Sequence, residues 1–286
     1  MKRTWLGIIL ILIGLAAGLV CGCQGAAQPS AVSTPPEFQV TFLDVGQADA
    51  ILIQCQDQDW LIDAGTNDTS QALVKSLASL GVVRLEAVVG THPHEDHIGG
   101  LDTVIDKMQI GQVYMPQVTS NTHTYEDVLK AIRSKGLTAS VPAAGSTFKL
   151  GNADGTWLGP NSLHYDELND YSLVMRVVYG NFSFLFMGDA GYIPEKEMLA
   201  AGYTLQSTVI KSGHHGSSSA TSAEFLKAVC PKYAVISVGQ DNDYGHPHAE
   251  TLARLQAAGA EILRTDLKGT ITFKVEGGEL KLGTQK

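Results

Sequence analysis

The chain has 286 residues, of which 44% are hydrophobic and 17% are charged, and its formal net charge is −9. This size and composition are ordinary for a folded protein with a sizeable core. An acidic chain has no general electrostatic attraction to nucleic acid or anionic lipid, which argues against tight non-specific DNA binding but leaves room for a local basic groove.

The N-terminus has the features of a bacterial export signal. Lys2 and Arg3 precede an apolar stretch over 6–20 that is shorter than the roughly 20 residues needed to span a bilayer. The sequence Val20-Cys21-Gly22-Cys23 resembles a lipobox in which Cys23 receives the lipid. We therefore predict a signal peptide over 1–23 and a chain that is tethered to the outer side of the cytoplasmic membrane, or secreted. An uncleaved N-terminal anchor is the alternative.

The remaining chain divides into a tether and one domain. Residues 24–36 are rich in Ala, Ser, Gln and Pro and are predicted to be a flexible tether, so the domain covers 37–286. Cys55 and Cys230 lie in apolar surroundings and are predicted to be buried thiols. The cysteines do not indicate a zinc cluster.

In the first half of the domain, apolar alternation and turn residues predict short strands followed by helices. Strands are expected at 38–43, 50–55, 60–62, 85–89 and 113–115, and helices at 70–80, 99–108 and 125–134.

The second half of the domain is also predicted to consist of short strands and helices. Strands are expected at 138–141, 147–150, 155–158, 172–179, 182–187, 208–211, 233–238, 262–263 and 270–275, and helices at 194–201, 222–229 and from 244–248 through 258. Two β-rich halves with helices outside predict two packed sheets with helical flanks, an α+β fold.

The densest chemical motif follows the predicted strand 85–89. Three imidazoles and two carboxylates occupy six consecutive positions, His92-Pro93-His94-Glu95-Asp96-His97. Histidine is the commonest metal ligand among side chains, and aspartate completes sites for divalent ions. This spacing can divide its ligands between two ions, with His92 and His94 on the first and Asp96 and His97 on the second.

Further residues of ligand type follow other predicted strands. They are Asp63, Asp189, the pair His214 and His215, and the pair His246 and His248. Connected strands deliver their carboxyl ends to one edge of a fold, where sites are normally assembled. The segment 213–219 lacks the lysine of a phosphate-binding P-loop, and Ser217 is predicted to cap the next helix.

Seven segments together resemble the metallo-β-lactamase fold superfamily, and within it the hydrolase domain of the competence DNA-uptake channel and its free-standing relatives. The matching segments are 42–50, 61–65, 91–100, 169–174, 187–189, 211–217 and 244–248. The resemblance implies a four-layer αββα sandwich with a dinuclear metal site that holds Zn²⁺, or Mn²⁺ as the alternative.

The resemblance also implies roles for individual residues. His92 and His94 would hold the first ion, Asp96 and His97 the second, and Asp189 both, while His214 or His215 would complete the set. Asp63, Asn169 and Asp44 would support the site without binding an ion. Many superfamily members place a third histidine for the first ion where this chain has Asn169-Asp170-Tyr171-Ser172. His123 and His164 match no motif and are expected at the surface.

The implied activity is metal-dependent hydrolysis of a phosphodiester, with DNA as the first candidate. Asp96 would orient a metal-activated hydroxide, and His246 or His248 would donate to the phosphoryl oxygens. A helix-capping role is the alternative for His246 and His248. The alternatives for the whole protein are hydrolysis of another exported substrate, such as a phosphocholine ester or a lactam, and capture of DNA or a partner through a vestigial site. No protein partner is predicted.

Overall fold

A computed structural model of the chain describes Met1 and residues 37–286. The predicted signal peptide, the lipid acceptor Cys23 and the tether therefore lie outside the described residues. Within the described part of the chain, none of the helices combines the length and the apolar composition needed to cross a bilayer.

Fifteen strands form two sheets. The first has the order β15-β14-β1-β2-β3-β4-β5-β6 and the second the order β13-β12-β11-β10-β9-β8-β7. The strands of the first sheet are β1 (Phe38–Phe42), β2 (Ile51–Cys55), β3 (Gln58–Ile62), β4 (Arg84–Val89), β5 (Gln109–Tyr114), β6 (Ala139–Ser140), β14 (Ile271–Glu276) and β15 (Glu279–Thr284). Those of the second are β7 (Thr147–Leu150), β8 (Ala153–Gly159), β9 (Val174–Tyr179), β10 (Phe182–Phe186), β11 (Val209–Lys211), β12 (Tyr233–Ile236) and β13 (Glu261–Arg264).

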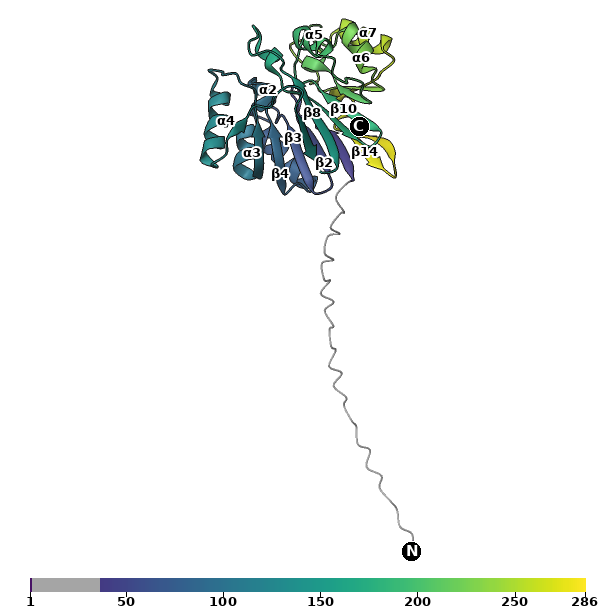
Figure 1. The fold of residues 1–286 in the computed structure, drawn as a ribbon. Helices are drawn as coiled ribbons and strands as arrows, with labels where there is room; N and C mark the ends of the chain where they lie inside the picture. Colours follow the sequence, from purple (N-terminus) through teal and green to yellow (C-terminus); the bar gives the residue numbers. More distant parts are fainter. Residues whose placement is uncertain (2–36) are drawn as a thin grey trace. The chain divides into compact units, whose positions relative to one another are not determined.

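Helices cover the outer face of each sheet. They are α1 (Ser70–Ser79), α2 (Glu95–Ile98), α3 (Leu101–Lys107), α4 (His123–Ser134), α5 (Tyr192–Ala200), α6 (Ala223–Val229), α7 (Ala249–Ala257) and α8 (Thr265–Lys268), with one-turn 3-10 helices η1 (Leu168–Tyr171) and η2 (Gly213–Gly216). Figure 1 shows α2, α3 and α4 grouped beside β3 and β4, and α5, α6 and α7 grouped apart from them. The order helix, sheet, sheet, helix confirms the predicted αββα sandwich.

Burial on both faces explains why the strands are almost continuously apolar. In β2, Ile51 and Ile53 face the core between the sheets, whereas Leu52 faces the core beneath α1 and α3. The outer face of the second sheet packs in the same way, because Leu185 and Ile210 contact the apolar residues of α5, α6 and α7. Three separate apolar layers therefore fix the position of the two sheets.

The sheet topology brings many strand ends to one edge. In the first sheet β3, β4, β5 and β6 run parallel, and in the second β10, β11, β12 and β13 run parallel. Parallel strands need helical crossovers, so the residues that follow each strand emerge at a common edge. The segments after β3, β4, β10 and β11 carry the predicted metal ligands, and all of them lie there.

Several elements differ from the prediction, and two of the differences have a clear physical reason. The expected helix over 99–108 begins earlier, as α2, and is interrupted at Gly99 and Gly100 before α3. A side chain at either glycine would overlap backbone, because a Cβ would lie 2.4 Å from Asn67 N or 2.3 Å from Ala64 O. Strand β15 was not predicted, since most of its residues are exposed. It forms through the two-residue turn Gly277-Gly278, in which both glycines have positive φ.

The prediction for Cys230 was wrong. Cys55 is buried, but Cys230 is exposed at the C-terminal end of α6. It adopts a left-handed conformation there (φ 47°) and its backbone N–H bonds to Leu226 O. The apolar residues near it in sequence belong to the buried faces of α6 and β12, whereas the cysteine occupies the exposed turn between them.

Ser222, not Ser217, caps α6, and its replacement by alanine is expected to lower the unfolding free energy by about 1 kcal/mol. Its side chain accepts a hydrogen bond from Phe225 N, which would otherwise have no acceptor in the first turn of the helix. Urea denaturation measures the change. Ser222→Thr keeps the hydroxyl and should retain most of the stability; equal losses for both variants would contradict the capping role.

Candidate metal centre

Five of the seven predicted ligands line one cavity of about 540 Å³ at the common strand edge, and the other two, His92 and His97, are fully buried. The first group comes from the first sheet, because His92, His94, Asp96 and His97 follow β4. Asp189 follows β10, and His214 and His215 form η2 directly after β11. Each sheet therefore contributes half of the centre. The cavity is lined by Gln47, Thr66, Pro93, His94, Glu95, Asp96, Thr122, Asn169, Asp189, His214, His215, Tyr244 and His246.

Asp96, His97, Asp189 and His215 converge with donor atoms that all lie within 4.8 Å of one another. His97 Nε2 and His215 Nε2 are 3.2 Å apart. His215 Nε2 is 3.2 Å from Asp96 Oδ2, and His97 Nε2 is 3.3 Å from Asp189 Oδ1. A tetrahedral ion bound at roughly 2.0–2.2 Å needs donors about 3.3–3.6 Å apart, so this group has the dimensions of a metal site.

The hydrogen bonds of the two imidazoles leave both Nε2 atoms available to an ion. His97 Nδ1 lies 2.8 Å from Asp63 Oδ2, and His215 Nδ1 lies 2.9 Å from Ser237 O. Both partners accept, so each Nδ1 carries the proton and each Nε2 presents a lone pair. Two lone pairs at 3.2 Å repel unless a cation or a proton lies between them. This arrangement fits a bound divalent cation.

The electrostatic field at this group also favours a cation. Burial by itself would lower the pKa of His97, but the carboxylates of Asp189, Asp63 and Asp96 outweigh it and hold that pKa well above its usual value. Burial would raise the pKa of Asp189, but His97 and His215 hold it well below the ordinary range. Asp189 Oδ1 is buried without a hydrogen-bond partner among the described residues. A buried carboxylate that stays charged and has an oxygen without a hydrogen-bond partner is suited to bind a metal ion.

The other oxygen of Asp189 faces a second, looser group. Asp189 Oδ2 lies 4.0 Å from His92 Nε2 and 3.7 Å from His214 Nε2. His92 Nε2 in turn lies 3.0 Å from His94 Nδ1. These residues surround the position predicted for the first ion, with His214 on the side where the third histidine is missing. Asp189 Oδ2 also lies 3.6 Å from His215 Nε2 of the tighter group, so the carboxylate lies between the two groups, in the position of a bridging ligand.

The backbone conformation of η2 determines which of the two ligand groups each of the consecutive histidines joins. Both His214 (φ 48°) and His215 (φ 49°) adopt the left-handed conformation, which costs a residue other than glycine about 1–3 kcal/mol. Their rings are 6.3 Å apart with an interplanar angle of 69°. His215 therefore joins Asp96 and His97, whereas His214 points to the first group. Sequence alone did not distinguish the two.

Asp63 and Asn169 contact ligands, as expected of supporting residues. Asp63 is buried and accepts hydrogen bonds from Thr91 N and Thr91 Oγ1, each at 2.8 Å, besides that from His97. Asn169 Nδ2 lies 3.3 Å from His214 Nε2. The structure does not place Asp44 in this role. Asp44 is exposed, and its carboxylate pairs with Lys286 at 3.4 Å.

The two later histidines have different surroundings. The ring of His246 lies 5.5 Å from that of His214 and lines the cavity. Burial, together with the charges of His214 and His215, lowers the pKa of His246 to about 4, so this imidazole is neutral at pH 7. His248 is instead the N-cap residue of α7, and its Nδ1 accepts a hydrogen bond from Ser218 N at 2.9 Å. His248 therefore occupies the cap position of α7, although its side chain makes no hydrogen bond to that helix, whereas His246 lies at the site.

Sequence reasoning missed two residues behind the histidines, Asp49 and Lys211. Their side chains are 2.6 Å apart and almost completely buried. Each is a single charged residue at the border of an apolar strand. Such a residue is rarely buried without a partner, and this is the signal in the sequence that indicated a pair. His123 and His164 are both exposed, as predicted.

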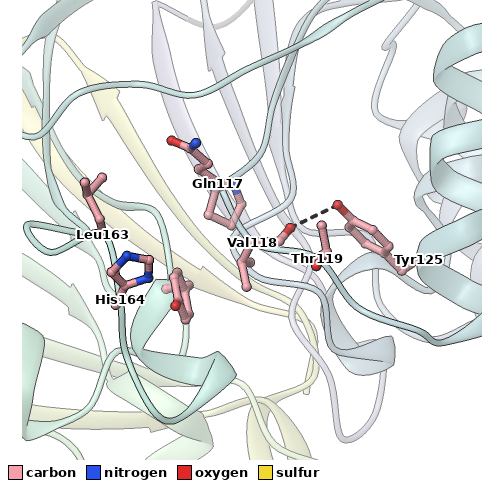
Figure 2. A pocket seen from close by; sticks show the side chains of 8 residues that line it. Gln117, Val118, Thr119, Tyr125, Leu163 and His164 are labelled. Carbon is pink, nitrogen blue, oxygen red and sulfur yellow. Dashed lines mark hydrogen bonds between the residues drawn. The ribbon is translucent and has the colours of Figure 1, made fainter.

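A larger cavity lies elsewhere. It has a volume of about 650 Å³, and Gln117, Val118, Thr119, Leu163 and His164 surround it, with Tyr125 bonded through its hydroxyl to Val118 O (Figure 2). Its one titratable imidazole, His164, is exposed and has no carboxylate beside it in this lining. The chemistry therefore lies in the smaller cavity.

Replacing Asp63 by asparagine is expected to weaken metal binding by roughly 10- to 100-fold, the usual cost of losing the partner of a ligating histidine. The amide can no longer act as a charged acceptor for His97 Nδ1–H. Competition with a coloured chelator measures the affinity. Asp154→Asn, at an exposed carboxylate paired with Lys149, is the control that should bind metal normally. Wild-type affinity in Asp63→Asn would contradict the supporting role.

Comparison with known proteins agrees with this geometry. A family model described as the metallo-beta-lactamase superfamily matches residues 43–240. ComE operon protein 3 of Bacillus subtilis (strain 168) is 28% identical over 83% of this chain and 33% of its own length. Competence protein ComA of Neisseria gonorrhoeae is 33% identical over 86% of this chain and 33% of its own length. The chain thus spans one third of the length of these curated relatives.

A solved structure shows the same fold. CmlA, a diiron beta-hydroxylase from Streptomyces venezuelae, superposes with a TM-score of 0.59 at 17% identity, over 85% of this chain and 55% of that chain. At this identity the likeness concerns the fold alone. The family match covers the strand ends that carry the histidines and carboxylates of the centre. The chain therefore belongs to the metallo-β-lactamase superfamily, whose members are generally metal-dependent hydrolases.

Proposed function

We propose that this protein is an exported, membrane-tethered phosphodiesterase that uses two divalent ions, with DNA as its first candidate substrate. The observation that carries the proposal is the position of the Asp189 carboxylate between the two groups of histidines. Its Oδ1 lies next to His97, and its Oδ2 lies within 4.0 Å of His92, His214 and His215. Two ions held a few ångströms apart generate a hydroxide at neutral pH and neutralise charge on a phosphoryl group. Imidazole with carboxylate suits Zn²⁺ foremost and Mn²⁺ as the alternative.

The residues of the chain supply binding and orientation. Asp96 is about one-third exposed at the cavity, where its carboxylate can accept a hydrogen bond from the attacking water. His246 is neutral, so the nitrogen that carries its proton can donate a hydrogen bond to a phosphoryl or leaving-group oxygen. The buried Asp63 and Ser237 O hold the imidazoles of His97 and His215 in one orientation during turnover.

Support for DNA comes from the resemblance to the hydrolase domain of the competence DNA-uptake channel, and one of the named relatives is a competence protein. The charge of the cavity does not add to it, because neither lysine nor arginine occurs in the lining among the described residues. Duplex DNA normally meets a basic surface. This lining favours a second candidate, a small phosphodiester of a cationic alcohol such as choline, since the exposed Tyr244 and Glu95 present an aromatic face and a carboxylate.

The direct test is a substrate screen on the full chain, stripped of metal and reloaded with Zn²⁺ or Mn²⁺. Bis(p-nitrophenyl) phosphate, single- and double-stranded DNA, p-nitrophenyl phosphocholine and a chromogenic lactam form the panel. We expect chelator-sensitive cleavage of phosphodiesters that Asp96→Ala abolishes. A loaded protein that leaves every phosphodiester intact would overturn the proposal, and DNA binding with less than one ion per chain would support the capture alternative.

The tether is tested separately. Full-length protein produced in a bacterial host should fractionate with membranes and acquire lipid, whereas Cys23→Ser should do neither. Lipid on Cys21, or a chain that keeps residues 1–22, would contradict the predicted processing. This result is independent of the substrate screen.

A further inference from the structure

A buried ion pair lies directly behind the metal ligands and takes no part in the chemistry proposed above. Lys211 Nζ lies 2.6 Å from Asp49 Oδ2, and the exposed fractions of the two side chains are 0% and 1%. A buried ion pair is weak evidence for stability by itself, because apolar residues of similar volume usually serve as well. The role of the pair therefore depends on the residues that it contacts.

The pair joins the two sheets at the ligand edge. Asp49 lies in the segment between β1 and β2 of the first sheet, and Lys211 is the last residue of β11 in the second. The ammonium of Lys211 also donates to Ser212 O at 3.0 Å and to Gly188 O at 3.4 Å. Gly188 precedes the bridging Asp189, and Ser212 leads into η2. The Lys211 ammonium thus contacts both ligand-bearing segments of the second sheet.

Asp49 contacts the ligand-bearing segments of the first sheet. Its backbone N–H donates to Asp96 O at 3.0 Å, and its carbonyl accepts from Gly65 N at 2.8 Å. Its carboxylate lies behind both imidazoles of the tighter ion group, with Oδ1 3.6 Å from His215 Nδ1 and Oδ2 3.9 Å from His97 Nδ1. These are the two rings whose Nε2 atoms face each other across the sheets.

We infer that the Asp49–Lys211 pair is a clamp between the sheets that positions the ligands of the second ion. Asp96 and His97 come from one sheet and Asp189 and His215 from the other, so the ion is held only when the two edges keep their spacing. The pair fixes that spacing from behind, and the charge of Asp49 holds both imidazoles with Nε2 toward the ion. The inference rests on the proposed metal centre but not on its substrate. Asp49 and Lys211 are positioning residues, since they act through the ligands.

The test separates positioning from folding with a pair of variants. In Lys211→Met the charge of Asp49 remains buried alone, so the midpoint of urea unfolding of the metal-free protein should fall. In the double variant Asp49→Asn/Lys211→Met neither position carries a charge that lacks its partner, and the midpoint should recover toward the wild-type value. Affinity for Zn²⁺ should nevertheless stay roughly 10- to 100-fold weaker in the double variant and in Asp49→Asn.

Co²⁺ provides a spectroscopic readout of the same variants. The intensity of its visible absorption depends on ligand geometry, so it should change in the double variant but not in Asp59→Asn. Asp59 is a partly buried carboxylate near the start of β3 that bonds to Gln54 and serves as the matched control. Affinity that recovers together with stability, or an unchanged Co²⁺ spectrum in the double variant, would overturn the inference and leave the pair a structural feature. Failure of the substrate screen would not overturn the inference, because metal binding is measured without substrate.

Discussion

The variant Asp189→Asn is expected to lose phosphodiester hydrolysis almost completely, and to retain at most one ion per chain where the wild type is expected to hold two. Asparagine has the size of aspartate but offers one neutral oxygen instead of two charged ones. The side chain then cannot face His97 on one side and His92 on the other as a bridging anion. We expect an activity loss larger than the roughly 100-fold that accompanies the loss of a hydrogen-bond partner of a ligand.

Metal analysis of the purified variant and initial rates with bis(p-nitrophenyl) phosphate measure the two effects. Asp154→Asn, at an exposed position of β8 in the same sheet, should leave both unchanged. Asp189→Asn protein that retains two ions and hydrolyses the ester at the wild-type rate would exclude a bridging role. Circular dichroism checks that the variant is folded, because removal of a buried negative charge also changes the balance with the neighbouring imidazoles.

The largest loss of stability is expected from Phe184→Ala, at roughly 3–5 kcal/mol of unfolding free energy. Phe184 lies in β10 with no exposed surface, at the centre of the layer between the sheets. Its ring centroid lies 5.4 Å from that of Phe38 and 6.0 Å from that of Phe273, both of which belong to the opposite sheet. Truncation removes these aromatic contacts and leaves a cavity that two rigid sheets cannot close.

Urea denaturation of the metal-free protein measures this loss without a contribution from bound ions. Phe182→Ala is the matched control, because Phe182 occupies the same face of β10 but is only partly buried. Its loss should be clearly smaller. Equal losses for the two phenylalanines would show that the centre of the sandwich does not dominate the stability of the domain.

Local sequence pattern was sufficient for most of the fold. The strands β9 and β10, turned at Gly180-Asn181, and the helices α1, α4 and α6 lie within a few residues of their predicted positions. Period and turn chemistry are local properties, so they can be recognised without knowing what packs against each element. Strand order is not local. The sequence does not reveal that β1 lies between β2 and β14, because that pairing joins residues more than two hundred positions apart.

The same distinction between local and non-local information applies to the metal centre. The sequence by itself determined that His92, His94, Asp96 and His97 form a metal-binding motif and that Asp189 and the His214-His215 pair end neighbouring strands, since residue type and spacing carry that chemistry. Only the tertiary structure decided which of the paired histidines joins Asp96, and that Asp44 lies away from the centre while Asp49 lies directly behind its ligands. Ring direction depends on the left-handed backbone of η2, and burial depends on the opposite sheet. Both arise from contacts between segments far apart in the chain, which no local pattern records.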